Sequence, residues 1–429
     1  MSTAQPLLDI RGLRVDYGAG PDAVHAVVDA DLVLRRGEVL GLAGESGSGK
    51  STLAYAAIRL LRAPGMITGG QVLYHPESGY TVDLLALNEA QLRGLRWSQI
   101  AVVLQSAMNA LNPVLSIGAQ LTDVLQAHVP DMDAAARTDR AAELLTMVGI
   151  TADRLRSFPH ELSGGMRQRV MIAMALALQP QVVILDEPTT ALDVVTQREI
   201  LEELSELRAR LGFAVLFITH DLSLLVEIAD AIAVMYAGRL VERADAASLF
   251  HAPRHPYTVG LLNSFPAMHG PRQRRTGIPG SPPDLRLLPP GCVFHPRCPF
   301  AVDRCTTESP PLLNPDRGSD RLAACWRQDG SGSVPAELAL PDPAAIGAAS
   351  PDGRGPAGVA DSPATGPRPA DRPSPDGPAP DGPATTYATS QGVADMTSAG
   401  GSGPVSPDRA TTKAPRTPSV TSADPGSQR

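Results

Sequence analysis

The sequence predicts an α/β fold around a largely parallel sheet. Short apolar, β-branched stretches alternate with segments whose apolar residues recur at helical spacing, which is typical of strands joined by helical connections. A glycine-rich turn lies between one such stretch and the helical segment that follows it. The chain has 429 residues, 43% of them hydrophobic, which is enough to fill the core of one large or two moderate domains.

Individual elements follow from the same pattern. Between residues 83 and 179 strand signals are sparse and residues 134–148 have helical spacing, so we expect a helical subdomain there. Strands are expected at residues 7–17, 39–43, 182–185, 214–219 and 231–236.

The chain changes character after about residue 250. We therefore expect a main domain over residues 1–250 and a small, Pro-rich appended domain over residues 251–328, which contains all 4 cysteines. Residues 329–429 are dominated by Pro, Gly, Ala, Ser, Thr and Asp and contain almost no large apolar side chains. Such a segment cannot bury enough surface to offset the entropy of ordering it, so we expect it to be disordered.

The composition argues against several classes of function. A formal net charge of -8 disfavours a protein that grips nucleic-acid phosphates, so no nucleic-acid partner is expected. The first eleven residues lack the basic start and apolar stretch of a secretory signal, and no run of about 18 apolar residues occurs. We therefore expect a chain that stays in the cytosol and does not span a membrane.

Residues 44–52 carry the phosphate-binding pattern GxxxxGKS in the required context, after an expected strand and before the helical stretch 51–61. The glycines let the backbone turn tightly and point N–H groups at phosphate oxygens, and the helix N-terminus adds positive potential. Lys50 can reach the terminal phosphates, and Ser51 can hold magnesium. The expected nucleotide-binding residues are Gly44, Glu45, Ser46, Gly47, Ser48, Gly49, Lys50, Ser51 and Thr52.

Two carboxylates, Asp186 and Glu187, end another apolar stretch. Parallel strands place them at the same sheet edge as the phosphate-binding loop. An Asp-Glu pair at a strand end is by itself more often a solvated turn, but the nearby loop favours a role in phosphoryl transfer. That chemistry needs a metal to neutralise charge and a separate group to orient the nucleophile. We expect Asp186 to bind magnesium through water and Glu187 to polarise the attacking water.

The segment LSGGMRQR at residues 162–169 resembles the signature of ATP-binding-cassette (ABC) proteins. An ordinary N-cap would explain the serine alone. The resemblance implies a helix whose N-terminus faces the γ-phosphate of ATP held by the opposite subunit. It covers about residues 7–250 and implies a P-loop NTPase of the ABC cassette type: a RecA-like core, an antiparallel β subdomain and a helical subdomain. The implied signature residues are Ser163, Gly164, Gly165 and Met166, the last replacing the commonest glutamine as in peptide-importer ATPases.

Four further positions match motifs of that family. Tyr17 resembles the aromatic that stacks on adenine, although core packing explains it equally well. Gln105 resembles the glutamine that senses magnesium in the catalytic site and links to transmembrane subunits, with residues 106–115 as the contact. Residues 191–193 resemble the loop that crosses the dimer interface through Asp193, and His220 resembles the histidine that contacts the γ-phosphate.

The segments HPYT at 255–258, GSPPDL at 280–285 and GCVFHPRCP at 291–299 resemble the C-terminal extension of oligopeptide and dipeptide importer ATPases. The cysteines are spaced wider than in most structural zinc sites. Four thiolates, one of them followed by proline, favour a [4Fe-4S] cluster, with zinc as the alternative and four free thiols as a third possibility. The candidate ligands are Cys292, Cys298, Cys305 and Cys325.

Together these resemblances imply the ATP-hydrolysing subunit of an importer of di- or oligopeptides at the cytoplasmic face of the cell membrane. They imply ATP and Mg²⁺ as cofactors. The implied partners are a second ATPase subunit, expected to be a paralogue, two transmembrane permeases and an extracytoplasmic solute-binding lipoprotein. An importer of nickel or oligosaccharides is the alternative. A soluble cassette ATPase of translation or DNA repair fits less well, because the chain has one cassette and no long coiled coil.

Overall fold

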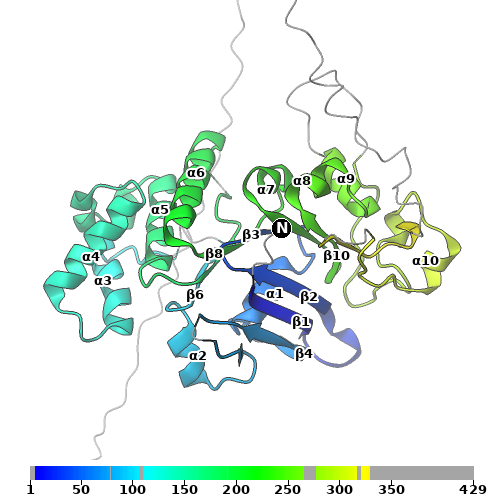
Figure 1. Ribbon diagram of the computed structural model, residues 1–429, viewed down its shortest axis with the longest axis horizontal. Coiled ribbons are helices and arrows are strands. Elements are labelled where there is room, and N and C mark those ends of the chain that lie inside the picture. Colours follow the sequence, from blue (N-terminus) through cyan, green and yellow to red (C-terminus); the bar gives the residue numbers. More distant parts are fainter. Residues whose placement is uncertain are drawn as a thin grey trace, which may run out of the picture. The chain divides into compact units, whose positions relative to one another are not determined.

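The computed structural model describes residues 5–77, 79–105, 110–190, 192–264, 277–315 and 320–328. In these residues the strands form two sheets, one four-stranded with order β2-β1-β4-β5 and one seven-stranded with order β11-β10-β9-β3-β8-β7-β6 (Figure 1). The strands are β1 Pro6–Tyr17, β2 Val24–Arg35, β3 Val39–Ala43, β4 Gly65–Tyr74, β5 Val82–Asp83, β6 Ile100–Val103, β7 Val182–Asp186, β8 Ala214–Ile218, β9 Ala231–Tyr236, β10 Arg239–Asp245 and β11 Leu322–Ala323.

The larger sheet has a parallel centre. Strands β6, β7, β8, β3 and β9 pair in parallel, and every residue of β3, β7, β8 and β9 is buried. Continuous burial is expected where helices cover both faces of a parallel sheet. The predicted parallel sheet is confirmed, and all five expected strands are present within a residue of their predicted ends.

Ten α-helices occur among the described residues, and most begin at a side chain that accepts a hydrogen bond from the first turn. Ser116, Asp133, Ser163 and Asp193 cap α3, α4, α5 and α6 in this way. The helices are α1 Lys50–Ala57, α2 Glu89–Leu95, α3 Ile117–His128, α4 Ala134–Met147, α5 Gly164–Ala175, α6 Val194–Leu211, α7 Leu222–Ile228, α8 Ala246–His251, α9 Pro256–Ser264 and α10 Asp303–Thr307, with 3-10 turns at η1 Gly20–Asp22, η3 Ala152–Arg156, η4 Pro159–Glu161, η5 His295–Arg297 and η6 Trp326–Gln328.

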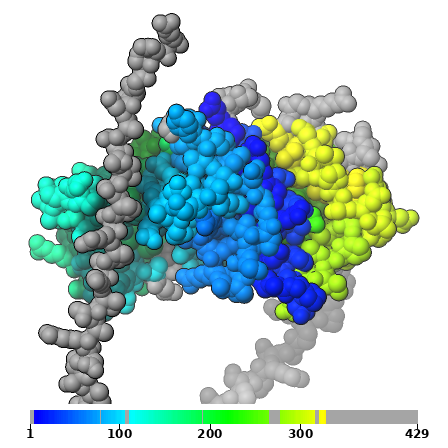
Figure 2. Space-filling view, turned by 90° about the horizontal axis from the view of Figure 1, so that it is seen from below, coloured from blue at the N-terminus to red at the C-terminus, as the bar shows by residue number. Residues whose placement is uncertain are grey.

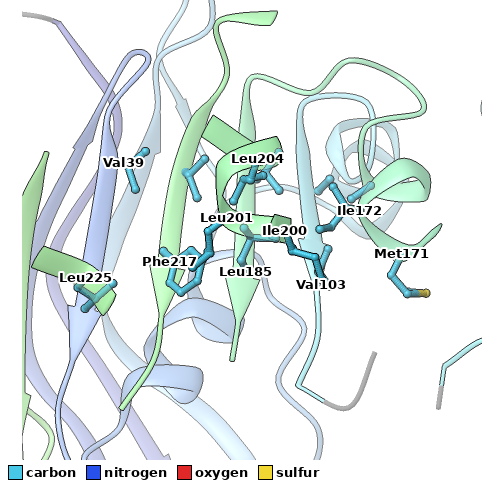
Figure 3. Packing of buried hydrophobic residues seen from close by; sticks show 14 of the residues in the cluster. Val39, Val103, Met171, Ile172, Leu185, Ile200, Leu201, Leu204, Phe217 and Leu225 are labelled. Atoms are coloured by element: carbon cyan, nitrogen blue, oxygen red, sulfur yellow. The ribbon is translucent and has the colours of Figure 1, made fainter. Parts of the chain in front are cut away.

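Side chains of the large sheet and of several helices, α6 among them, form the main core. In Figure 3, Val103, Leu185 and Phe217 of neighbouring strands point toward a row of apolar residues on α6. Burial of a side chain of this size contributes about 1.5–3 kcal/mol to stability. This core therefore fixes the strand ends that carry Asp186 and Glu187. The α6 residues of the row are Ile200, Leu201 and Leu204.

Helices α3, α4 and α5 pack together, at the left of Figure 1, and they include the expected helical segment. The predicted range 83–179 also contains β6, which the sequence reasoning missed. This strand pairs with β7 in the large sheet, so that part of the range belongs to the core. Its four residues are too few to give a clear period.

The residues after 250 are joined directly to the large sheet. Strand β11 pairs with β10 at the sheet edge, and Glu242 of β10 accepts hydrogen bonds from Arg321 and from the backbone N–H groups of Arg254 and His255. Figure 2 shows this segment, in yellow, lying against the N-terminal strands in dark blue. Residues on both sides of position 250 thus share one sheet.

Some expectations fall outside the described residues. The predicted disorder of residues 329–429 lies there, as do residues 106–109 of the expected permease contact and Ala191 of the expected interface loop. In the part of the chain that the structure describes, no helix is both long enough and apolar enough to cross a membrane.

Candidate nucleotide-binding and hydrolysis site

The phosphate-binding loop connects β3 to α1 and depends on two close backbone approaches. A Cβ on Gly44 would lie 2.3 Å from the Met235 carbonyl oxygen, and one on Gly49 would lie 2.3 Å from that of Ala26. Both glycines have positive φ angles, 147° and 101°. Because Gly49 precedes α1 and has no capping side chain, the N–H groups of the first turn remain available to an anion.

The side chain of Lys50 folds back into the loop. Its Nζ donates to the carbonyl oxygens of Gly44 and Glu45 at 2.8 and 2.9 Å. Burial lowers the pKa of this ammonium, and the charges of Glu187, Asp186 and Glu45 oppose that shift. The lysine therefore sits at the base of the loop, where phosphate oxygens could replace the two carbonyls as acceptors.

Asp186 lies next to Ser51, the other residue that the sequence predicts to bind magnesium. Ser51 donates to its Oδ1 at 3.0 Å, and Tyr55 donates to its Oδ2 at 2.5 Å. Burial raises the pKa of Asp186, whereas these two hydrogen bonds lower it. The hydroxyl and carboxylate oxygens are ligands that suit Mg²⁺. Sequence reasoning missed Tyr55, although its place one helical turn after Ser51 could have revealed it.

Glu187 gathers side chains from three segments. Its Oε2 accepts hydrogen bonds from Gln105 Nε2 at 2.8 Å and Thr190 Oγ1 at 3.1 Å, and its Oε1 lies 3.3 Å from His220 Nδ1. Glu187 itself has φ of 47°, an uncommon value for a side chain of this size. The structure thus brings Gln105, Glu187 and His220 together. Their catalytic roles stay predictions.

The signature segment forms the start of α5. Ser163 Oγ accepts from Met166 N at 3.2 Å, so the ordinary capping role is present. A Cβ on Gly165 would lie 2.5 Å from Thr196 Cγ2, so glycine is needed where α5 meets α6. Asp193 caps α6 through Thr196, whose hydrogen bonds lower the pKa of that carboxyl. Contact of these residues with a nucleotide on another subunit stays a prediction.

Comparison with protein families finds two matches. Residues 27–190 match the ABC transporter family, and residues 241–305 match the C-terminal region of oligopeptide/dipeptide transporters. The second match begins in β10 and covers the segment that holds α9 and the first three cysteines.

Related proteins align over nearly their whole lengths. A Brucella melitensis protein provisionally named a peptide import ATP-binding protein is 44% identical over 76% of this chain and 98% of its own length. The oligopeptide transport ATP-binding protein OppD of Escherichia coli is 43% identical over 76% and 94%, and that of Haemophilus influenzae is 42% identical over 75% and 97%. The chain belongs to the oligopeptide/dipeptide-type ABC transporter ATPases. It binds ATP and is an ATP-hydrolysing enzyme.

Tyr17 of this ABC ATPase is half-buried at the end of β1. Its hydroxyl lies 3.3 Å from Thr52 Oγ1, and its ring packs against Gly65, where an added Cβ would approach Cε1 to 2.9 Å. Tyr17 therefore contacts α1 beside the phosphate-binding loop. Stacking of its ring on adenine stays a prediction.

The loop of the ABC ATPase is also held by its C-terminal extension. Arg297 forms a bidentate ion pair with Glu45, and the Glu45 N–H donates to the hydroxyl of Tyr257 at 2.8 Å. Neither contact was expected, because local sequence patterns cannot reveal a pair separated by 252 positions.

The four cysteines lie near one another. Burial raises the pKa of Cys298 to about 11 and that of Cys325 to about 12, and in both cases the neighbouring thiols add to the shift. Cys292 N donates to the Cys305 carbonyl oxygen at 2.8 Å. The donor chemistry suits a thiophilic metal. However, no group of three or more His, Cys, Asp or Glu among the described residues is arranged to hold one. The expected [4Fe-4S] or zinc site is therefore not supported by this geometry.

Proposed function

We propose that this chain is the ATP-hydrolysing, energy-coupling subunit of an ABC importer of di- or oligopeptides, peripheral to the cytoplasmic face of the cell membrane. The observation that carries the proposal is that one chain joins a full set of hydrolysis residues to an extension of the oligopeptide/dipeptide type. Proteins named for oligopeptide transport are similar to it over this same length.

The contacts of the site residues support a role for each. Mg²⁺, held by Ser51 and Asp186, would neutralise charge that develops on the transferred phosphoryl group. Lys50 would exchange its loop carbonyls for phosphate oxygens. Glu187 would orient the attacking water. Gln105 and His220, which contact Glu187 in this structure, would then contact the metal and the nucleotide instead. Their mutual hydrogen bonds keep these polar groups satisfied until ATP arrives.

Two kinds of partner complete the proposal. A single phosphate-binding loop and a single signature in the chain require a second ATPase subunit, which we propose is a paralogue. We propose that residues 106–115, which follow Gln105, form the permease contact. Val114 and Leu115 of this range, and Leu104 before it, are exposed large apolar side chains. Such side chains are suited to burial against two transmembrane subunits, which in turn receive peptide from a solute-binding lipoprotein.

The test is transport by the assembled complex. The chain is co-expressed with two candidate permeases and a candidate second ATPase, reconstituted in vesicles, and supplied with ATP and a solute-binding protein. Labelled di- and oligopeptides should accumulate, whereas nickel and an oligosaccharide should not compete. Accumulation of nickel or an oligosaccharide in place of peptide would contradict the proposed substrate. Purification of the chain with ribosomes or DNA and without permeases would contradict the role in transport.

We also propose that the four cysteines bind a [4Fe-4S] cluster, with zinc as the alternative metal. The nearness of four thiols supports this, although the ligand arrangement does not. Protein purified without oxygen should contain about four irons and matching sulfide per chain. Stoichiometric zinc would contradict the cluster and support the alternative metal. Metal-free protein with four titratable thiols would contradict both.

A further inference from the structure

Glu45 is a carboxylate inside the phosphate-binding loop, directly after Gly44. Acidic groups beside a triphosphate repel it. Two other acids near Lys50, Asp186 and Glu187, have roles in metal binding and in orienting water, but Glu45 has no such role. Its negative charge must therefore be compensated by another group if ATP is to bind tightly in this loop.

Arg297 of the extension supplies the compensation. Its NH1 and NH2 groups donate to Oε2 and Oε1 of Glu45 at 2.7 and 3.0 Å, which is the bidentate geometry of a strong Arg–carboxylate pair. The Arg297 side chain is only 5% exposed, whereas that of Glu45 is 28% exposed. The pair is thus shielded from solvent on the side of the extension.

Further hydrogen bonds fix the guanidinium in place. Nε donates to the Pro279 carbonyl oxygen at 2.8 Å, NH1 to the Tyr236 hydroxyl at 3.3 Å and NH2 to the Gly280 carbonyl oxygen at 3.4 Å. Arginine is charged at every physiological pH, and these contacts hold the guanidinium without a bound nucleotide.

Tyr257 holds the backbone of the same loop residue. Its hydroxyl accepts the Glu45 N–H, and its ring packs among aromatic neighbours, with the Tyr236 ring 4.6 Å and the Phe294 ring 5.4 Å away between centroids. Tyr257 is fully buried. Two residues of the extension therefore bind Glu45: Arg297 binds its side chain and Tyr257 binds its N–H.

We propose that Arg297 is a positioning residue for ATP binding: it neutralises Glu45 and draws the carboxylate away from the phosphates, while Tyr257 fixes the loop backbone. The inference rests on the ATP-binding function of the chain and assigns the extension a direct part in it. Nucleotide affinity then depends on the extension, although Arg297 does not touch the nucleotide.

The test compares ATP dissociation constants, measured by titration with a fluorescent ATP analogue, of the full chain and its variants. Arg297→Gln leaves an uncompensated carboxylate beside the phosphates, so affinity should fall roughly ten- to thirtyfold, as expected for one unit charge several ångströms away at intermediate dielectric. The loss should shrink as ionic strength rises. Affinity for adenosine, which lacks phosphates, should not change.

The decisive arm is the double variant. Glu45→Gln removes the charge that Arg297 compensates, so Glu45→Gln/Arg297→Gln should bind ATP more tightly than Arg297→Gln alone. A purely structural role of Arg297 predicts no such rescue. Arg297→Lys should be intermediate, because lysine keeps the charge but not the bidentate contact. The matched control is Arg304→Gln in the same extension, since Arg304 pairs with exposed Glu308 and stacks on Trp326.

Three results would overturn the inference: wild-type affinity for ATP in a folded Arg297→Gln chain, an equal loss of adenosine binding, or a double variant no better than the single one. Circular dichroism and thermal melting establish that each variant is folded. If the wild-type chain itself failed to bind ATP, the ATPase function would be contradicted instead, so the two failures are distinguishable.

Discussion

At the scale of single residues, the side chains proposed for hydrolysis already have hydrogen-bond partners within the protein. Lys50 bonds to loop carbonyls, Ser51 to Asp186 and Gln105 to Glu187. ATP binding therefore exchanges existing partners and does not have to order free side chains, which lowers the entropic cost of assembling the site. Substitutions here should separate nucleotide binding from the chemical step.

Glu187→Gln removes the charge that polarises the attacking water but keeps an acceptor for Gln105. Hydrolysis in the assembled complex should fall by at least about 100-fold, while ATP binding is retained and the closed state accumulates. Phosphate release and nucleotide retention measure the two effects. The matched control is Glu199→Gln, an exposed carboxylate paired with Arg169. Unchanged turnover of the Glu187 variant would contradict its catalytic role.

Tyr55→Phe tests the hydrogen bond that the Tyr55 hydroxyl donates to Asp186. Burial raises the pKa of Asp186, and the Tyr55 hydroxyl opposes that shift. Without the hydroxyl the pKa should rise further, so the acidic limb of the kcat/KM profile should move to higher pH and the magnesium requirement should increase. Tyr74→Phe is the control, because its hydroxyl bonds to Gln99 and Gln181. An unmoved acidic limb would exclude Asp186 as the group that titrates.

At the scale of elements, strands made of uninterrupted apolar residues were easy to predict, and strands interrupted by polar residues or glycines were hard to predict. Strands β3 and β9 occupy the predicted residues because every side chain is apolar and buried. Strand β2 has regular polar interruptions, β4 has glycines, and β6 has only four residues, so none gave a clear signal. The motif residues Lys50 and Glu187 could be placed because Glu187 directly follows buried strand β7, and Lys50 ends the glycine-rich loop that follows buried strand β3.

The start of α9 depends on a neutral histidine. His255 Nδ1 accepts the Tyr257 N–H at 3.1 Å, and burial lowers the pKa of His255 to about 3. Below the ordinary histidine pKa of about 6.5 the unfolded chain takes up a proton that the folded chain does not. Between pH 7.5 and pH 5 this histidine should therefore reduce the free energy of unfolding by about 2 kcal/mol.

His255→Asn isolates this contribution, because asparagine can also cap a helix but does not titrate. The stability difference between wild type and variant, measured by urea denaturation, should change by that amount in favour of the variant as the pH falls. A difference independent of pH would show that His255 is not the titrating group.

At the scale of the whole molecule, the extension and the cassette share one sheet and one core. Strand β11 closes the edge of the large sheet, and buried aromatic side chains of the extension pack on Tyr236 of β9. The sequence indicated a boundary near residue 250 because composition changes there. It could not show that residues on both sides complete one core, since contacts such as Arg297 with Glu45 join distant positions.

Arg321→Ala tests whether the extension and the cassette unfold together. Arg321 donates to the fully buried Glu242 at 3.0 Å and also to the Ala252 carbonyl oxygen, so its loss leaves a buried carboxylate without its ion-pair partner. Removing one member of such a pair destabilises by about 3–5 kcal/mol. Because β10 belongs to the cassette sheet, we expect one thermal transition, shifted as a whole, for the described extension and cassette. Arg304→Ala, at an exposed pair, should cost less than about 1 kcal/mol. Two transitions, with the ATP-binding part unshifted, would show that the extension unfolds by itself.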